Sequence, residues 1–427
     1  MLEDFRISPA DSLDIAIAGC GPAGLAAALL LHRGGHRVTL FERFDEPRPL
    51  GSGLMLQPTG MAVLAKLGLA EAVAMRGARI DALKGLEEHG RTALDAPYSR
   101  LGLPGAFGIG IHRASLFDVL YQAALGAGIE IQTAHEITGS ALAAGGRQLI
   151  FADGARSRPM DLLVDATGWN TPLGDGGADS AGASVLPFGA LWASLPVAPD
   201  DSHARNLLEQ RYRRASQMVG VLPIGTRGPG QPQEVAFFWS LKGADHARWL
   251  ATPLDDWKAE VRALWPQIAF LLDRIHTRDQ LTFARYAHRT ARRSHGDKFI
   301  RIGDAWHSAS PQLGQGANMA LLDAWALAQR LSEGRSVTEA LRYVCATRRG
   351  HVALYQAVTA AFTPLFQSDS TLLPALRDRV LAPLSGFAPV ARIQAQLMSG
   401  LFGWPLAMLG LDAPDYAALA AAQQEVT

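Results

Sequence analysis

The chain of 427 residues has little of what marks several classes of protein. It contains only two cysteines, Cys20 and Cys345, far apart and without the spacing of a metal site or a redox pair. This argues against a disulfide framework and fits a reducing, cytoplasmic compartment. Forty basic residues balance forty acidic ones, with no long block of one sign, so no nucleic-acid partner is expected. The sequence also shows no internal repeat, low-complexity tract or metal-ligand cluster.

Long uninterrupted hydrophobic runs are missing too. The apolar stretch 13–31 contains Asp14, several glycines and Pro22, and the acidic leader lacks a basic region, so we expect no targeting segment. The apolar tail 363–405 is broken by five prolines, well short of a membrane span. This tail is expected to cover the core; a dimer surface or a peripheral membrane contact are the alternatives, in a monomer or homodimer.

What the sequence does have is a strand, glycine turn and helix near its start. "LDIAIAGCGPAGLAAALLLHRGGHRVTLFER" predicts a strand over 14–18, a helix from Pro22 to about Arg33, and a second strand over 37–42. The glycines permit a tight turn close to a pyrophosphate, and an acid at the end of the second strand suits a ribose. The length favours two packed domains, the first of which binds a dinucleotide. Candidate binding residues here are Gly19, Gly21, Pro22, Ala23, Gly24, Glu42 and Arg43.

A second motif separates FAD from NAD. "FIRIGDAWHSASPQLGQGANMALLDAWALAQRL", residues 299–331, predicts a strand, a turn at Gly303-Asp304 and a glycine loop that opens an amphipathic helix. Such a loop presents backbone N–H groups and the positive end of the helix dipole, which can stabilise negative charge on a reduced flavin. Candidate residues are Gly303, Asp304, Pro311, Gly314, Gln315, Gly316, Ala317 and Asn318.

This motif resembles the second FAD motif of the class A flavoprotein monooxygenases, the para-hydroxybenzoate hydroxylase group. The segments 42–69 and 111–125 resemble the same family, and the tail 363–405 is similar to that of ubiquinone-biosynthesis hydroxylases. The resemblance implies that Asp304 binds a ribityl hydroxyl, that 311–318 line the flavin ring, and that Arg113 contacts the phosphate or ribityl region. It also places Gly53 and Gly168 near the cofactor.

One stretch departs from that family. Where its members continue with Gly-Ala-Asp-Gly, then Ser and Arg, this chain has "DATG" at 165–168, Thr171 and Gly174. The family's Asp and Arg are associated with FAD and with transient nicotinamide nucleotide binding. Gly168 keeps a small residue where FAD approaches, whereas Thr167 and Gly174 cannot replace a charged acceptor and a phosphate-pairing arginine. The stretch puts the usual nicotinamide contact in doubt, with drift in a tolerant loop as the alternative.

Residues 187–281 contain short aromatic segments that predict an antiparallel sheet, which in this family forms the substrate domain. The fold class is therefore α/β: a glutathione-reductase-like FAD-binding Rossmann domain with an inserted antiparallel β-sheet substrate domain and C-terminal helices. We expect the FAD-binding domain at 1–75, 105–180 and 285–335, the substrate-binding domain at 76–104 and 181–284, and the helical region at 336–427. Pocket candidates, each also suited to a packed core, are Trp192, Met218, Val221, Phe238 and Trp239.

The resemblance implies an FAD-dependent monooxygenase. It would use non-covalent FAD, with NADPH or NADH as reductant, to oxygenate an apolar, aromatic small molecule with O₂ through a flavin C4a-hydroperoxide, in secondary metabolism or quinone-type biosynthesis. The chemistry is centred on the flavin, so no catalytic side chain is assigned. Two alternatives remain: an FAD oxidoreductase or isomerase without an ordinary NAD(P)H step, and a flavin protein that binds an intermediate without turnover. A halogenase is disfavoured because its Trp-x-Trp-x-Ile-Pro stretch is absent.

Overall fold

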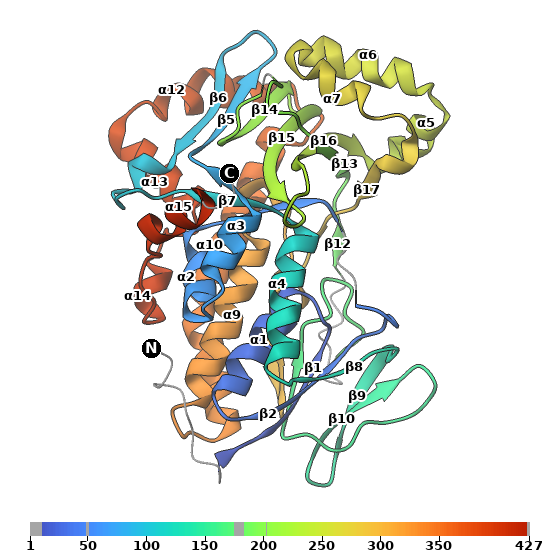
Figure 1. Ribbon diagram of the computed structural model, residues 1–427, viewed down its shortest axis with the longest axis vertical. Coiled ribbons are helices and arrows are strands. Elements are labelled where there is room, and N and C mark those ends of the chain that lie inside the picture. The colour runs from blue at the N-terminus through green and yellow to red at the C-terminus, as the bar shows by residue number, and fades with distance from the viewer. Residues whose placement is uncertain (1–10, 48–50, 175–182, 202, 425–427) are drawn as a thin grey trace.

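The first strand of the chain lies inside a six-stranded sheet at one end of the molecule (Figure 1). The computed structural model describes residues 11–47, 51–174, 183–201 and 203–424. β1 (Asp14–Ala18) pairs in parallel with β2 (Arg37–Phe41) and β11 (Leu162–Asp165). The sheet order is β19-β20-β11-β1-β2-β8, with β8 at Glu130–Gln132, β19 at His295–Gly296 and β20 at Phe299–Arg301. β1 and β11 are buried on both faces, as expected of a parallel sheet covered by other elements.

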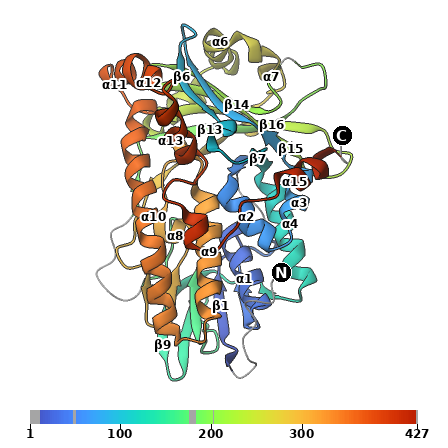
Figure 2. The same cartoon turned by 90° about the vertical axis from the view of Figure 1, so that its left-hand side faces the viewer.

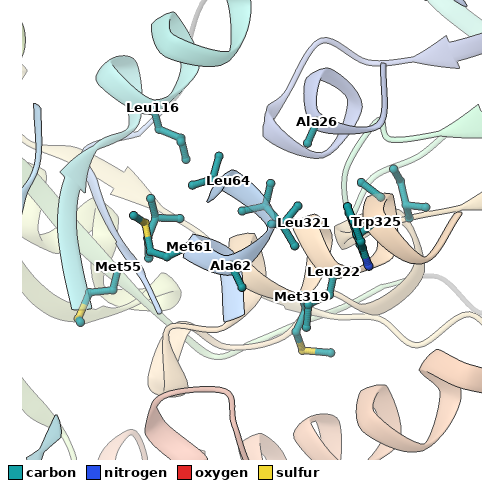
Figure 3. Packing of buried hydrophobic residues seen from close by; sticks show 14 of the residues in the cluster. Ala26, Met55, Met61, Ala62, Leu64, Leu116, Met319, Leu321, Leu322 and Trp325 are labelled. Carbon is teal, nitrogen blue, oxygen red and sulfur yellow. The ribbon is translucent and has the colours of Figure 1, made fainter. Parts of the chain in front are cut away.

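Helices pack against this sheet and against one another in the largest hydrophobic cluster. α1 (Pro22–Arg33) lies against α9 (Gly316–Leu331) and α4 (Arg113–Gly126), and α2 (Pro58–Lys66) also contacts α9. Figure 3 shows Ala26, Leu64, Leu116 and Leu321 from these four helices around one centre. α1 ends at Arg33 because Gly34-Gly35 follows, and Gly35 adopts a φ of +98° that side chains disfavour.

A seven-stranded sheet forms the opposite end of the molecule (Figure 1). Its order is β17-β13-β16-β15-β14-β5-β6, and all neighbours pair antiparallel except β14 and β5. α5 (His246–Ala251), α6 (Leu254–Leu264) and α7 (Ala269–Asp273) cover its outer face. The strands are β5 Ala82–Glu87, β6 Thr92–Pro97, β13 Phe188–Pro196, β14 Leu207–Arg213, β15 Gln217–Thr226, β16 Gln233–Lys242 and β17 Thr282–Ala284.

Glycines bring the two ends of the molecule together. A three-stranded sheet of β3 (Gly53–Leu56), β7 (Gly108–His112) and β4 (Ala78–Ile80) packs on β15. A Cβ on Gly110 would lie 2.0 Å from the Pro223 carbonyl oxygen, so only glycine allows this approach. The smaller elements are α3 Ala70–Arg76, β9 Ile137–Ala143, β10 Gly146–Phe151, β12 Ser184–Val185, β18 Ala287–His288 and α8 Asp304–His307.

The C-terminal region is helical and packs against α9 and against the strand β6 of the seven-stranded sheet. α10 (Val337–Phe366) runs along much of the molecule beside α9 (Figure 2) and continues two residues beyond Pro364, which we expected to break it. In the part of the chain that the structure describes, none of the helices is both long and apolar enough to cross a membrane. The remaining elements are α11 Leu372–Leu376, the π-helical turn η8 Arg377–Leu381, α12 Ala382–Leu384, α13 Ala388–Met398, α14 Pro405–Met408 and α15 Tyr416–Gln424.

Candidate active site

The first glycine turn joins β1 to α1 at very short range. Gly19 has a φ of +101°, and a Cβ there would lie 2.6 Å from the Ala166 carbonyl oxygen at the end of β11. A Cβ on Gly24 would lie 2.0 Å from the Gly19 carbonyl oxygen. Gly21, by contrast, faces open space, and α1 starts at Pro22 without a side-chain cap. The turn therefore leaves the positive end of α1 open to an anionic ligand.

Glu42 is fixed beside this turn by three backbone N–H groups. Its Oε2 accepts from the N–H of Cys20 at 3.0 Å, and its Oε1 accepts from those of Arg43 at 2.9 Å and Phe44 at 3.2 Å. β2 ends at Phe41, one residue earlier than we predicted, so Glu42 belongs to the connection. The Arg43 side chain is exposed over the Phe44 ring. Glu42 is thus held rigidly where a ribose hydroxyl can meet its carboxylate.

The turn at Gly303 lies between α1 and α9. Gly303 has a φ of +57°, and a Cβ there would lie 3.0 Å from the Ala320 Cβ and 3.4 Å from the Ala23 Cβ. Its N–H donates to Oδ2 of Asp323 at 2.9 Å. The two predicted cofactor motifs, far apart in the sequence, therefore converge on one place.

Asp323 supports this turn through a fully buried network. Besides the N–H of Gly303, its carboxylate contacts Nε2 of His307 at 2.6 Å and Nε of Arg348 at 2.8 Å. Burial acts to raise the pKa of Asp323, but His307 and Arg348 outweigh it and hold the pKa at about 2. The carboxylate is therefore ionised and ties α8, α9 and α10 together.

Asp304 and Arg113 face the same space from different elements. The Asp304 side chain is exposed, yet it is surrounded closely enough that burial raises its pKa, against the opposing effects of Arg113 and His307. A Cβ on Gly316 would lie 3.7 Å from Oδ1 of Asp304, and one on Gly51 would lie 3.0 Å from Cδ of Arg113. Since its surroundings desolvate it although solvent still reaches it, the Asp304 carboxylate stands in a recess beside Arg113, which we call the cofactor cleft.

The loop before α9 is braced by two of its predicted cofactor residues. The side chain of Asn318 donates to the carbonyl oxygens of Met55 and Gly314, both at 3.0 Å, and Gln315 donates to that of Met398 at 2.8 Å. Both side chains are buried, whereas Pro311 and Gly316 are exposed, and Gly314 has a φ of +61°. Gly316 therefore faces solvent at the cofactor cleft, while the buried side chains of Asn318 and Gln315 fix the loop through hydrogen bonds to backbone carbonyl oxygens.

The unusual stretch after β11 is organised by Asp165. Its Oδ1 accepts from the N–H and the hydroxyl of Thr167 at 3.1 and 2.7 Å, and its Oδ2 accepts from the hydroxyl of Thr171 at 2.7 Å. Burial raises the pKa of Asp165, while both threonines and Arg301 act to lower it. Gly168 has a φ of +91° and faces open space. The Thr167 side chain is therefore engaged with the protein itself.

Aromatic side chains line the inner face of the seven-stranded sheet. The rings of Trp192 and Phe238 lie 4.7 Å apart at 32°, and a Cβ on Gly220 would meet the Phe238 ring at 2.0 Å. Nε1 of Trp192 donates to the Tyr286 hydroxyl at 2.8 Å. Burial raises the pKa of Tyr286 to about 12, while the hydrogen bond from Trp192 and the charge of Arg113 act to lower it.

The sheet separates the five predicted pocket residues into two groups. Met218 and Phe238 belong to the inner cluster, against which Trp192 packs. Val221 and Trp239 belong to the outer cluster beneath α5, α6 and α7. Successive residues of a strand point to opposite faces, so Phe238 and Trp239 cannot share a pocket. We therefore remove Val221 and Trp239 from the pocket.

Several residues that the sequence did not single out also belong here. Gly51, Tyr286 and Asp323 contact or support the cleft, but no local pattern distinguishes them from ordinary loop or helix residues. Gly53, a predicted cofactor residue, has a packing role, because a Cβ there would lie 2.5 Å from Cγ2 of Ile224. Among the described residues, no group of three His, Cys, Asp or Glu side chains could hold a metal ion.

The residues that line the cleft fit an FAD molecule. The open turn at Gly21 and the fixed carboxylate of Glu42 suit a pyrophosphate and a ribose. Asp304 and Arg113 supply an acceptor and a cation further along, and the backbone at Gly316 meets them. The aromatic inner face of the seven-stranded sheet, with Trp192 and Phe238, carries Tyr286 beside it. These features are compatible with a dinucleotide site beside the aromatic inner face of the seven-stranded sheet.

Comparison with known proteins identifies the class. The FAD binding domain family matches residues 12–336, and the chain belongs to this family. It is 28% identical over 358 residues to 6-methylpretetramide 4-monooxygenase of Streptomyces rimosus, covering 80% of this chain and 81% of the relative. It is also 28% identical to phenazine 1,6-dicarboxylic acid hydroxylase PhzS of Lysobacter antibioticus, covering 82% and 90%.

A solved structure shows the same fold. The tetrameric form of 2-methyl-3-hydroxypyridine-5-carboxylic acid oxygenase superposes with a TM-score of 0.74 at 21% identity, covering 93% of this chain and 98% of that one. The expected fold class, an FAD-binding α/β fold with sheets and C-terminal helices, is confirmed. The protein is an FAD-dependent monooxygenase of the aromatic-hydroxylase type, similar to the para-hydroxybenzoate hydroxylase group.

Proposed function

We propose that the protein oxygenates an apolar, planar aromatic molecule of secondary metabolism, with O₂ as co-substrate and NADPH or NADH as reductant. The observation that carries the proposal is the aromatic inner face, where Trp192 and Phe238 lie against each other next to the cleft. Flat aromatic side chains favour flat aromatic ligands. The names of the two relatives, which specify a pretetramide and a phenazine, agree with this substrate class.

The residues of this chain bind, orient and shield. Bound FAD supplies electron transfer and oxygen activation. The glycine turn at 19–24, Glu42, Arg113, Asp304 and the backbone at 316–317 would hold it. Tyr286 fixes the Trp192 ring through its hydroxyl, and Gly220 leaves room for the Phe238 ring. Together they would orient a ring between them and the cofactor.

The C-terminal helices would exclude water from this pocket. The Arg377 guanidinium is buried over the rings of Tyr212 and Phe366, and it donates to the carbonyl oxygens of Arg214 and Leu365. It thereby fixes the end of α10 to the strand β14. A closed pocket protects a reactive oxygenating species from loss to water.

The test combines cofactor content with turnover. The purified protein should carry non-covalent FAD and should oxidise NADPH or NADH faster when a planar aromatic compound is added, with one oxygen atom appearing in the product. Trp192→Ala should lower substrate affinity or the ratio of product to oxidised nucleotide, with FAD content unchanged. Trp404→Ala is the matched control, since Trp404 is 77% exposed. Loss of FAD in Trp192→Ala with unaltered substrate handling would refute the pocket assignment.

A further inference from the structure

A cleft with a volume of about 760 Å³ lies outside the site described above. The segment 290–297 forms one wall and contributes Arg292, Arg293 and His295. α10 forms the other wall and contributes Arg342 and Arg349. Trp306 and Val352 are apolar residues of its lining. The cleft therefore combines a cationic rim with an apolar floor.

Among the described residues, three arginines of this cleft have poorly compensated charges. Asp297 is its only carboxylate among the described lining residues. Within the described part of the chain, the side chains of Arg292, Arg342 and Arg349 make no hydrogen bond or close ion pair, and all three are exposed. Burial lowers the pKa of His295, and Arg342 lowers it further. Guanidinium groups without protein partners around a concave surface attract a multiply charged anion.

The cleft begins beside the stretch in which the family's arginine is missing. One Arg301 guanidinium in β20 donates to the carbonyl oxygens of Arg293 at 2.6 Å and Leu173 at 3.1 Å. Arg293 of the cleft and the residue before Gly174 are therefore bridged by a single side chain. The stretch 165–174 itself contains no arginine or lysine. The backbone of this stretch is therefore joined through Arg301 to a segment that contributes arginines to the cleft.

We propose that this arginine-lined cleft binds the phosphate-bearing part of the nicotinamide nucleotide that reduces the flavin. The inference rests on the proposed function, which requires such a donor. Bidentate guanidinium contacts suit the pyrophosphate and any further phosphate of the nucleotide. The apolar floor of Trp306 and Val352 suits the uncharged part of the same ligand. Arg342 and Arg349, which line the cleft, would make the contact with the phosphates.

Calorimetric titration of the FAD-loaded protein with NADP⁺, NAD⁺, ADP and inorganic pyrophosphate tests this directly. NADP⁺ or NAD⁺ should bind saturably, and the double variant Arg342→Gln/Arg349→Gln should bind about ten- to a hundredfold more weakly for each lost charge-assisted contact. The matched control, Arg379→Gln/Arg392→Gln, removes two exposed arginines elsewhere and should bind like the unmodified protein. FAD content, thermal unfolding and reduction by dithionite should be the same in all three.

The outcomes separate the cleft from the proposed function. Equal nucleotide affinity in the cleft variant and the unmodified protein overturns the cleft assignment and leaves the monooxygenase standing. Binding of pyrophosphate without NADP⁺ or NAD⁺ also overturns it, because the site would then recognise phosphate alone. Cleft-dependent nucleotide binding without flavin reduction by NADPH or NADH supports the cleft while refuting the proposed reductant.

A second, independent observation concerns the C-terminal helices. Leu372, Leu376, Val380 and Leu384 recur every four residues through α11, η8 and α12, and they are 75%, 42%, 45% and 51% exposed. The inward side of the same turns carries Arg377, which is 1% exposed. The helical face that meets solvent is therefore apolar, the reverse of an ordinary surface helix.

Further exposed apolar side chains extend this face. Phe387 is 64% and Ile393 is 44% exposed at α13, and Trp404 beside α14 is 77% exposed. α12, α13 and α14 lie along one edge of the molecule (Figure 1). The only charged residues between 379 and 411 are Arg379 and Arg392, and both are exposed. We propose that this face rests on a bilayer with anionic headgroups, because it combines apolar and aromatic anchors with exposed cations, and because Asp378, the one carboxylate within residues 372–411, is half-buried and paired with Arg377.

Vesicle sedimentation tests the surface. The protein should sediment with phosphatidylcholine vesicles that contain phosphatidylglycerol, and Leu376→Gln/Phe387→Gln should abolish this. Leu125→Gln/Leu142→Gln, which changes two exposed leucines elsewhere, should leave binding unaltered. Light scattering completes the test by measuring the oligomeric state. If the unmodified protein does not bind vesicles but is a dimer, and the Leu376→Gln/Phe387→Gln variant is a monomer, the face binds a second copy and the membrane proposal is overturned.

Discussion

Asp323 and Asp304 lie close to one turn, and we predict that changing each to asparagine impairs a different property. The Asp323 variant should lose stability, and the Asp304 variant should lose affinity for FAD. Asp323 is fully buried, and its carboxylate forms hydrogen bonds with the Gly303 N–H, His307 and Arg348. Asp304 is exposed at the proposed cofactor site. Asp323→Asn leaves the buried Arg348 without its carboxylate, so the free energy of unfolding should fall by about 3–5 kcal/mol. Asp304→Asn removes no buried partner and should change it by less than about 0.5 kcal/mol.

For the affinity of the protein for FAD, the variant with the larger effect should be Asp304→Asn. If the Asp304 carboxylate accepts a hydroxyl of FAD, Asp304→Asn loses a charge-assisted hydrogen bond of about 1.5–3 kcal/mol, and the FAD dissociation constant rises about ten- to a hundredfold. Urea unfolding without added FAD measures the first quantity, and fluorescence titration of the apoprotein with FAD measures the second. Equal stability of the two variants, or unaltered FAD affinity in Asp304→Asn, would refute the reasoning.

The pH dependence of the Asp323 effect has a definite sign. The pKa of Asp323 is about 2 in the folded protein, and an aspartate in an unfolded chain titrates near about 3.9. A depressed folded pKa contributes stability that is present above the unfolded pKa and is lost as the pH falls through the folded pKa. The stability difference between the unmodified protein and Asp323→Asn should therefore be constant down to about pH 4 and should shrink between about pH 4 and pH 2.

The remaining predictions concern the pocket and the stretch after β11. Tyr286→Phe leaves the Trp192 N–H without its acceptor, so substrate affinity measured by titration should fall while FAD content stays the same. Trp239→Ala should instead destabilise the protein by about 3–5 kcal/mol in urea unfolding, because it empties a core position. Thr167→Asp should lower the unfolding midpoint, since it sets a second carboxylate against Asp165, whereas Thr167→Ser should retain the hydrogen bond.

Local patterns were sufficient for the elements around the cofactor. α1 begins at Pro22 and ends at Arg33 as predicted, because a proline at the first turn and a Gly-Gly pair after the last are both strong signals. The aromatic runs likewise predicted β13, β15 and β16. β14 was missed because its residues are mostly half-buried and show no clear alternation, and its parallel partner β5 lies far earlier in the chain.

The pocket shows a different kind of error. The alternation of side chains along a strand already separates Phe238 from Trp239, so their grouping was avoidable from the sequence. Met218 and Val221 lie an odd number of positions apart in β15 and separate for the same reason. Tyr286 was not accessible to this reasoning, because its role depends on its contact with Trp192 across 94 positions of the chain.

The departure at 165–174 can now be explained as one structural unit. A carboxylate at 165 that has to stay buried requires donors, and the hydroxyls of Thr167 and Thr171 supply them at 2.7 Å each. An aspartate at 167, as the resembling family has it, would bring a second acceptor to Oδ1 of Asp165 instead of a donor, so the family's residue does not fit beside this Asp165. The stretch is therefore internally consistent rather than a degraded version of the family's motif. Its carboxylate and hydroxyl groups bond to one another, so the proposed nucleotide phosphate would need cations from another segment, and Arg301 joins the carbonyl oxygen of Leu173 in this stretch to that of Arg293 at the arginine-lined cleft.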